Sequence, residues 1–359
     1  MNRRITLADI AKRAGYHPTT ISMALRNHPR LPEATTKKIQ ALAKEMGYQP
    51  DPALGALVAY RRNASPKQQA APLAYVTNWD TEWGWKSTRT HLSFYEGATN
   101  RATELGYKID HFWLGQPGVS HERTNEILLN RGIRGLIIAS HMPGSDEEPN
   151  LDWSRFSSVK IDFVPTQLHV HTISNDQRAI VQLAFCKALN AGYKRIGFVL
   201  PHWYDSYVNH AWSAGFLASQ LQIPEEDRIP LKFFHTAPGA NSGVPVTEFE
   251  QWRLKHQPEV IISYSEFVRP AFEMLQIQTP DDFAYIDICP ETKDGDHAGV
   301  FNNCTRVGEL AVEILAGQLQ QNQIGLPDYP TVTKVEGTWI EGESLPKVEL
   351  SNVSKTITR

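Results

Sequence analysis

The chain opens with polar and apolar positions that recur at the period of an α-helix, and this pattern predicts three short helices. The first follows Thr6, because Thr6 and Asp9 approximate a capping box, and it ends at Gly15, where a helix C-cap favours a positive φ. The apolar face of this helix consists of Leu7, Ile10, Ala11 and Ala14.

A second helix is predicted to begin at Pro18, since a proline in the first turn of a helix loses no hydrogen bond. Ile21, Ala24 and Leu25 form its inner face. The outward side chains are short and none is acidic, so they could approach base edges and phosphates closely. These outward residues are Pro18, Thr19, Thr20, Ser22 and Met23.

A third amphipathic helix is predicted from Pro32 to Gly47. Three small helices of this kind make a helix-turn-helix headpiece, with a generic capped helical hairpin as the alternative. The buried residues predicted for the third helix are Ile39, Leu42, Ala43 and Met46.

From residue 72 onward, short β-runs alternate with amphipathic helices. This alternation predicts parallel sheets with right-handed crossovers, and the number of strands favours two doubly wound lobes that face a cleft. The predicted strands are 72–78, 107–114, 135–140, 157–162, 169–175, 194–200, 229–234, 259–264, 282–288, 298–303 and 331–340. The predicted helices are 91–107, 121–131, 176–193, 207–222, 246–256, 267–277 and 304–321.

Composition agrees with a folded protein of more than one domain. The chain has 359 residues, 41% of them hydrophobic and 21% charged, which suits two or three domains. The net charge of −3 is unevenly distributed, because residues 1–62 contain eleven Lys or Arg against four Asp or Glu. The head therefore carries +7 and the remainder −10, as expected for a nucleic-acid-binding module on an acidic body.

No motif in the sequence indicates catalysis or cofactor binding. The sequence contains no GxGxxG, P-loop, GxSxG or HExxH motif, so we predict no catalytic residue and no cofactor. Thirteen histidines, including His169 and His171, are expected to be surface or satisfied polar residues. The three cysteines have no metal-like spacing and are expected to be buried free thiols, with no metal site; they are Cys186, Cys289 and Cys304. Neither a signal sequence nor an apolar run of membrane length is present, which predicts a cytoplasmic protein.

The order of the motifs TLADIAKRAG, TTIS, PEAT and GYQPDP resembles the headpiece and hinge of the lactose-repressor (LacI/GalR) family of bacterial transcription regulators. In that family the segment that matches ALGALVAY is a hinge helix, which folds on DNA, pairs with its copy from the other subunit and inserts a leucine into the minor groove. Leu57 stands at that leucine's position, Gly55 should weaken the helix, and Arg61 and Arg62 would meet phosphates. A proline-bounded linker is the alternative for this segment.

The resemblance implies which residues contact DNA. Met23 stands where many members carry arginine or histidine, so it can offer only an apolar contact. The implied DNA-binding residues are Thr6, His17, Pro18, Thr19, Thr20, Ser22, Met23, Arg26, Arg30 and Leu57.

The body of the chain also resembles the family's core, which is shaped like periplasmic sugar-binding proteins. Tryptophans are expected in loops at strand ends, at 79, 83 and 85 and at 203, where ligands of α/β sheets collect and where indole faces suit a sugar. Two departures are Trp212, where sugar-binding members often have arginine, and Ser265-Glu266 in place of an Asn-Asp pair. The predicted effector-binding residues are Trp79, Asp176, Trp203, Trp212, Glu266 and Asp287.

Together these features predict a homodimeric transcription regulator, usually a repressor, that binds double-stranded operator DNA and a small-molecule effector of the carbohydrate class. The alternatives are a sugar-binding protein and a sugar-acting enzyme with a dispersed site, and no membrane partner is expected. The predicted plan is a headpiece at 1–49, a hinge and linker at 50–71, a two-lobed effector-binding and dimerisation core at 72–345, and a tail at 346–359.

Overall fold

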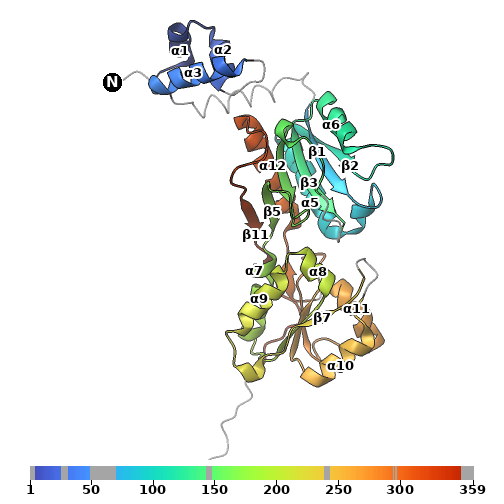
Figure 1. Ribbon diagram of the computed structural model, residues 1–359. Helices are drawn as coiled ribbons and strands as arrows, with labels where there is room; N and C mark the ends of the chain where they lie inside the picture. The colour runs from blue at the N-terminus through green and yellow to red at the C-terminus, as the bar shows by residue number, and fades with distance from the viewer. Residues whose placement is uncertain are drawn as a thin grey trace, which may run out of the picture.

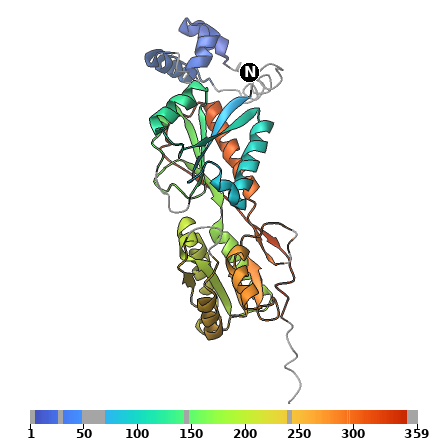
Figure 2. The ribbon, with the colours of Figure 1, turned by 90° about the vertical axis from the view of Figure 1, so that its right-hand side faces the viewer.

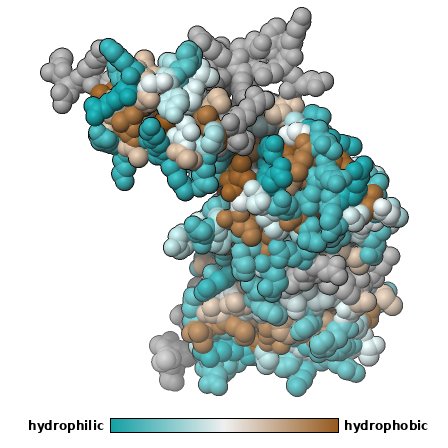
Figure 3. All heavy atoms as spheres, turned by 45° about the horizontal axis from the view of Figure 1, so that its top comes forward, coloured by the Kyte–Doolittle hydropathy of each residue, from teal (hydrophilic) through white to brown (hydrophobic). Residues whose placement is uncertain are grey.

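The computed structural model describes residues 5–25, 31–48, 70–142, 148–237, 243–293, 295 and 297–348. A small helical headpiece lies at one end, followed by two α/β lobes stacked end to end (Figure 1). The face drawn in Figure 3 is mostly hydrophilic, with apolar side chains showing in smaller groups. Within the described residues, no helix is both long and apolar enough to cross a bilayer.

The headpiece contains α1 (Leu7–Ala14), α2 (Pro18–Leu25) and α3 (Glu33–Glu45), as predicted. The capping box is confirmed, because the hydroxyl of Thr6 accepts from the backbone N–H of Asp9 at 3.3 Å while a carboxylate oxygen of Asp9 accepts from the N–H of Thr6 at 2.8 Å. Gly15 has a φ of 72°, as its C-cap position requires. The headpiece core consists of Ile10, Ala11, Ile21, Ala24, Ile39 and Ala43, whereas Leu42 and Met46 are only partly buried.

The N-terminal lobe has a parallel sheet of the strand order β11-β5-β4-β3-β1-β2. Its strands are β1 (Ala71–Asn78), β2 (Tyr107–Trp113), β3 (Gly135–His141), β4 (Ser157–Ile161), β5 (His171–Asn175) and β11 (Val332–Val335). Its helices are α5 (Arg89–Glu104), α6 (His121–Asn130) and α12 (Cys304–Gln321), with 3-10 turns at Gly84–Ser87 and Trp153–Arg155.

Helices α5 and α12 pack against each other through two glycines. A Cβ at Gly97 would lie 2.0 Å from the carbonyl oxygen of Thr305, and one at Gly308 would lie 2.0 Å from that of Phe94. No side chain fits at either position, so the close approach of these two helices depends on glycine. Distant parts of the chain are thereby joined in one lobe.

The C-terminal lobe has a six-stranded sheet of order β12-β10-β9-β8-β6-β7. Its strands are β6 (Ile196–Pro201), β7 (Lys232–Phe234), β8 (Val260–Ser263), β9 (Ala284–Asp287), β10 (Gly299–Phe301) and β12 (Thr338–Ile340). Its helices are α7 (Gln177–Asn190), α8 (His202–Tyr207), α9 (Ala211–Gln220), α10 (Val246–His256) and α11 (Ser265–Met274), with a 3-10 turn at Glu225–Asp227.

Four local expectations were wrong. The single closing strand at 331–340 is two strands, one in each lobe, and β12 runs antiparallel to β10. The loop expected at Trp203 is the short helix α8. The following helix starts later than predicted, because Asn209 and His210 have φ values of 54° and 57° that interrupt it. Cys186 is exposed instead of buried.

The described chain passes between the lobes three times, between β5 and α7, between β10 and α12, and between β11 and β12 (Figures 1 and 2). These crossings are hydrogen-bonded to one another: the side-chain amide of Asn175 donates to the carbonyl oxygen of Asn302, and that of Asn303 donates to the carbonyl oxygen of Glu336 at 2.8 Å. The first two crossings leave the carboxyl ends of strands. The carboxyl ends of the two sheets therefore face the junction between the lobes.

Candidate DNA-binding surface and inter-lobe site

Helix α2 separates its inner and outer side chains as the sequence predicted. Ile21 and Ala24 are fully buried, whereas Pro18 and Thr19 are exposed. Thr20, Ser22 and Met23 are partly buried at the edges of that outer face. This outer face presents the ring of Pro18, the hydroxyl groups of the threonines and Ser22, and the thioether of Met23. The helix has no carboxylate that would repel a phosphate.

The imidazole of His17 caps α2. Its Nδ1 accepts from the backbone N–H of Thr19 at 3.3 Å and lies 3.0 Å from the Thr19 hydroxyl oxygen. Because Pro18 has no N–H, the Thr19 N–H is the first donor of the helix that needs a partner. An accepting Nδ1 places the ring proton on Nε2, which leaves this exposed side chain with one N–H donor for another group.

Other predicted DNA-binding residues differ in how they are placed. The Thr6 hydroxyl donates to the Asp9 carboxylate at 2.7 Å, so its proton is already used within the capping box. Arg13, which is not among the predicted contacts, pairs with Glu45 at 3.0 Å, and both side chains are exposed. The predicted contacts at Arg26, Arg30 and Leu57 lie outside the described residues.

In each sheet, the direction in which successive strands are added reverses at one point, and this point lies near the lobe junction. In the N-terminal sheet the switch lies between β1 and β3, and in the C-terminal sheet between β6 and β8. Open α/β sheets bind ligands at such switch points, outside the carboxyl ends of the strands. Trp79 directly follows β1 and Trp203 comes two residues after β6, which brings both predicted site residues to this junction.

Polar side chains of the two lobes meet there. The hydroxyl of Tyr207, at the end of α8, donates to the carbonyl oxygen of His141, at the end of β3, at 3.2 Å. The pKa of His91 is lowered to about 4 by burial and by His141 nearby. The edge of the His91 ring also contacts Trp79, with 5.6 Å between ring centroids. His91 is therefore held neutral at physiological pH beside the junction.

Asp162 directly follows β4, has a φ of 71° and is 7% exposed. Burial raises the pKa of this carboxyl to about 7, although Lys160 opposes the shift. The Lys160 ammonium also donates to backbone carbonyls, that of Pro165 at 2.6 Å among them. Burial raises the pKa values of Tyr204 and Tyr207 in the other lobe, and the negative charge of Asp162 adds to both shifts.

Asp287 ends β9 and is 3% exposed. Its carboxylate accepts from the Ser265 hydroxyl and from the backbone N–H of Cys289 at 2.8 Å, while burial raises its pKa. Glu266 lies beside it, and burial also raises the pKa of Glu266 against the opposing effect of Arg269. Asp287 is thus buried at the carboxyl end of β9 with Ser265 as a hydrogen-bond donor, whereas Glu266 is an exposed residue at the start of α11.

The aromatic residues of the C-terminal lobe form one cluster. The rings of Trp203 and Tyr204 are stacked, with 4.9 Å between centroids and 3° between planes. Trp212 is only 1% exposed and lies 4.7 Å from Tyr204, and its indole N–H donates to the side-chain oxygen of Gln177 at 2.6 Å. Trp212 therefore belongs to the lobe's core and has no N–H to offer a ligand.

The predicted site residue Asp176 lies at the first crossing. It caps α7 by accepting from the backbone N–H of Ala179 at 3.1 Å, and it pairs with Lys334 at 3.5 Å. Its carboxylate thus has structural partners in both lobes. Four junction residues were not identified from sequence, namely His91, His141, Asp162 and Tyr207. Of these, His141 and Asp162 carried a usable signal, because His141 directly follows a predicted strand and Asp162 ends one.

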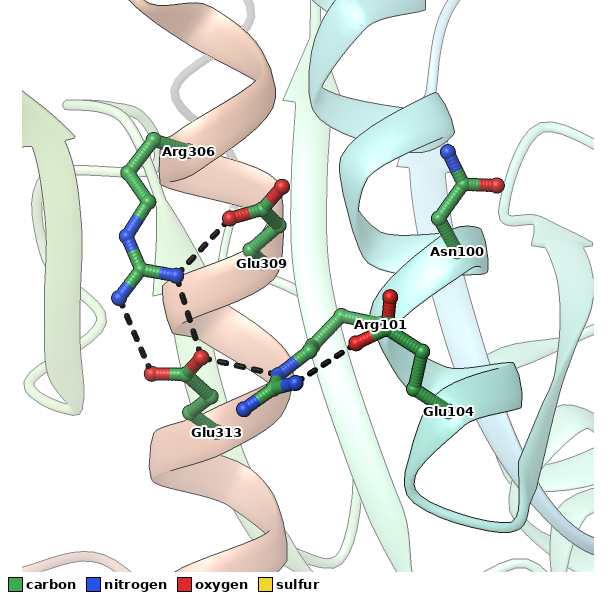
Figure 4. A pocket seen from close by; sticks show the side chains of 6 residues that line it. All are labelled: Asn100, Arg101, Glu104, Arg306, Glu309 and Glu313. Atoms are coloured by element: carbon green, nitrogen blue, oxygen red, sulfur yellow. Dashed lines mark hydrogen bonds and ion pairs between the residues drawn. The ribbon is translucent and has the colours of Figure 1, made fainter.

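A separate hollow of about 420 Å³ lies between α5 and α12 (Figure 4). Arg101 pairs with Glu104 at 2.6 Å and with Glu313 at 2.9 Å, while Arg306 pairs with Glu309 at 2.8 Å and with Glu313 at 3.1 Å. Both guanidinium groups are already neutralised by neighbouring carboxylates. This network fastens α5 to α12, and it has no unpaired charge for a ligand.

One Ser, His and Asp group resembles a catalytic triad only in composition. Asp205 is fully buried and accepts from His210 Nδ1 at 3.0 Å and from the Ser213 hydroxyl at 2.8 Å. The Ser213 hydroxyl thus donates to a carboxylate and has no imidazole to activate it. Within the described ranges, no group of three or more His, Cys, Asp or Glu residues could hold a metal ion.

Comparison with known proteins agrees with this arrangement. Residues 6–51 match the family model described as bacterial regulatory proteins, lacI family. Over 202 residues the chain is 24% identical to the transcriptional regulator MalR of Streptomyces coelicolor, an alignment covering 54% of this chain and 53% of MalR. Over 47 residues it is 47% identical to ExuR of Bacillus subtilis, named as a probable transcriptional repressor, covering 13% of this chain and 14% of ExuR. The chain thus spans about half the length of MalR and much less of ExuR.

Among solved structures, the transcriptional regulator CelR in complex with cellobiose aligns with a TM-score of 0.57 at 15% identity, covering 95% of this chain and 100% of CelR. The lac repressor dimer bound to operator aligns with a TM-score of 0.57 at 16% identity, covering 96% of this chain and 100% of that chain. Headpiece and core define a class of proteins in which a helix-turn-helix unit is joined to a two-lobed core like that of periplasmic binding proteins. The match to the lacI family model covers the headpiece, and the likeness of the core to these solved structures is one of fold.

Proposed function

We propose that this protein is a sequence-specific transcriptional regulator, a repressor, that acts in the cytoplasm as a homodimer. Two headpieces would bind the half-sites of double-stranded operator DNA. The observation that carries the proposal is the outer face of α2, which presents small side chains and hydroxyl groups without any acidic residue in a headpiece that matches the lacI family model. The surplus of basic residues in the first 62 positions supports the same conclusion.

The residues that would contact DNA are those predicted from the sequence. Pro18, Thr19 and Met23 would read base edges, and the His17 Nε2–H would donate to a phosphate. The hinge at 50–71 would contribute Leu57 as a minor-groove wedge and thereby couple the core at 72–345 to the headpiece at 1–49.

The core would bind a small-molecule effector of the carbohydrate class at the lobe junction. Buried carboxyl groups and stacked indole and phenol rings suit hydroxyl groups and C–H faces of a sugar. Ligand would shift DNA affinity by binding the two core arrangements unequally, without touching the headpiece. Neither a sugar-binding protein nor a sugar-acting enzyme would account for the headpiece.

The experiment is a gel shift of the full-length protein on the region upstream of its own operon, repeated at increasing salt. We expect saturable binding whose log affinity falls with log salt with a slope of magnitude about 4 or more per dimer, because several phosphates lose their counterions. A flat salt response, or equal binding to unrelated DNA, would contradict the proposal. Glu45→Gln serves as a control, since it frees Arg13 and should strengthen binding slightly.

A further inference from the structure

The loop between β4 and β5 contributes side chains to the apolar cores of both lobes. Its later residues Leu168 and Val170 are each 2% exposed and belong to the core of the N-terminal lobe. Val164 belongs instead to the buried core cluster of the C-terminal lobe, and Phe163 packs against the same cluster. Residues 162–170, which we call the inter-lobe loop, therefore connect the two cores, although both flanking strands belong to the N-terminal sheet.

A buried lysine of β4 holds this loop in place. Lys160 is only 5% exposed. Its ammonium donates to backbone carbonyl oxygens of the loop, at 3.4 Å to Phe163, 2.6 Å to Pro165 and 3.4 Å to Leu168. An ammonium group has three N–H donors, which is one for each of these carbonyls. Such partners offset the cost of burying the charge, and without the ammonium the carbonyls would lose a buried donor.

The ammonium ties together two parts of the loop that pack in different lobes. Phe163 and Pro165 flank Val164, whose side chain lies in the C-terminal core, whereas Leu168 is packed in the N-terminal core. Because one ammonium binds carbonyls on both sides, the position of Val164 relative to the N-terminal lobe depends on Lys160. A methionine at this position would have a similar length but no donor, so it could fill the space without holding the loop.

The inter-lobe loop also begins at the candidate effector site. Asp162 is its first residue and directly follows β4. Across the junction, the Tyr207 hydroxyl donates to the carbonyl oxygen of His141 at 3.2 Å, and Tyr207 belongs to the same core cluster as Val164. The lobes are therefore joined in both directions, by a tyrosine of the C-terminal lobe and by a valine of the N-terminal lobe.

We propose that Lys160 is a positioning residue of the inter-lobe site. By holding the inter-lobe loop, it keeps Val164 in the core of the C-terminal lobe and thereby holds the two lobes together beside Asp162. The role of the junction as an effector site rests on the proposed function, whereas the contact between the lobes does not. A ligand that reaches Asp162 touches the start of this loop, so loss of Lys160 would loosen the site without removing a group that the ligand contacts.

The test uses the protein's own cysteines to report separation of the lobes. Cys186 is exposed, whereas Cys289 is half-buried in the C-terminal lobe and interacts with the side chain of Thr90 in the N-terminal lobe. Full-length protein is treated with N-ethylmaleimide at neutral pH, and labelling of each cysteine is followed by peptide mass spectrometry. We expect Lys160→Met to label Cys289 at least ten times faster than the unsubstituted protein does, with the rate at Cys186 unchanged.

Two control variants separate lobe contact from a general loss of stability. Ile137→Ala removes a fully buried side chain from the cluster that packs against α5 and α12, and Lys108→Met makes the same substitution at an exposed lysine of β2. Neither variant should accelerate labelling of Cys289 in the absence of denaturant. The proposal is overturned if folded Lys160→Met labels Cys289 no faster than Ile137→Ala does.

If Lys160→Met fails to fold, Val164→Ala takes its place, because it removes the apolar anchor in the C-terminal lobe and keeps the ammonium. The same acceleration at Cys289 is expected, and an unchanged rate contradicts the proposal. A gel shift on operator DNA is made with the same samples. Operator binding together with unchanged labelling refutes this inference alone, whereas faster labelling in a protein that never binds operator refutes the proposed function alone.

Discussion

The headpiece and the core differ in how far apart in the sequence their candidate site residues lie. In the headpiece, Pro18, Thr19 and Met23 belong to one helix of eight residues, and the helix's own periodicity divides the exposed face from the buried one. In the core, His91 and Asp287 reach the same junction from elements far apart in the sequence. A binding surface on one helix can therefore be predicted from a short stretch of sequence. A site between two sheets cannot, because the strand order decides which residues meet there.

The strongest test of this difference is the same core substitution in each region. Ile39 in α3 and Ile262 in β8 are 1% and 0% exposed. Replacing either isoleucine with alanine should lower the free energy of unfolding of its region by about 2–5 kcal/mol. Because six buried residues form the headpiece core, Ile39→Ala should unfold the headpiece and lower operator affinity more than a hundredfold, while thermal unfolding of the core stays unchanged. Ile262→Ala should lower the core's melting temperature and leave operator binding intact at low temperature. Normal operator binding by a folded Ile39→Ala protein would contradict the independence of the two regions.

Ionisation of Asp162 at the lobe junction should lower the stability of the core as pH rises. The pKa of Asp162 is about 7, above its ordinary 3.8, so between these values the unfolded chain releases a proton that the native state keeps. Stability contributed by this group therefore falls as pH rises from about 4 to 7, and the loss is complete above pH 7. Asp162→Asn should make the core more stable at pH 8 by roughly 2–4 kcal/mol.

Urea denaturation at pH 5 and pH 8 measures this effect. The lowered pKa of His91, about 4, gives the opposite slope, because the unfolded chain binds a proton that the native state excludes. The Asp162→Asn variant should therefore gain stability from pH 4 to 6.5. A variant with the same pH profile as the unsubstituted protein would show that Asp162 ionises normally.

Sequence preference should change when Met23 is replaced. A thioether can offer only an apolar contact, for instance to a thymine methyl group, whereas arginine can bond the two acceptors of guanine. Met23→Arg should shift one operator position toward guanine by about 1–3 kcal/mol of discrimination, without abolishing binding. Selection from a randomised operator measures the shift, and Met274→Arg on the exposed face of α11 is the control. An unchanged preference would remove Met23 from the base-reading face.

The smallest effect concerns the cap of α2. His17→Ala should lower headpiece stability by about 1 kcal/mol, because the N–H of Thr19 loses its acceptor. His17→Ser restores an acceptor but not the Nε2–H donor, so it should recover stability and still bind operator more weakly than the unsubstituted protein. Thermal melting and gel shift separate the two roles. If His17→Ser recovers both properties, the histidine acts as a cap alone.

Much of the fold could be predicted because periodicity and turn residues are local. The cap at Gly15, the start of α2 at Pro18 and the alternation of strands and helices all follow from short stretches. The divided strand at 331–340 could not be predicted, because a local pattern does not show that Gly337 must pass closer to Val300 than any side chain allows.

The site was predicted only in part for the same reason. Trp79 and Trp203 could be placed at the junction because they come just after predicted strands, and Asp287 because it stands near the end of one. Tyr207 and His141 were missed, since their contact is a hydrogen bond between lobes that only the three-dimensional arrangement creates.

The return of α12 and β11 to the first lobe also determines when that lobe can form during synthesis. A ribosome that has completed β5 has made five of the lobe's six strands, yet the buried surface of Tyr75 and Ile137 still lacks Val312 and Leu315 of α12. The nascent lobe must wait through the translation of the entire second lobe, while the headpiece can fold as soon as it emerges. A chain released before α12 is made would leave that apolar surface of the sheet exposed.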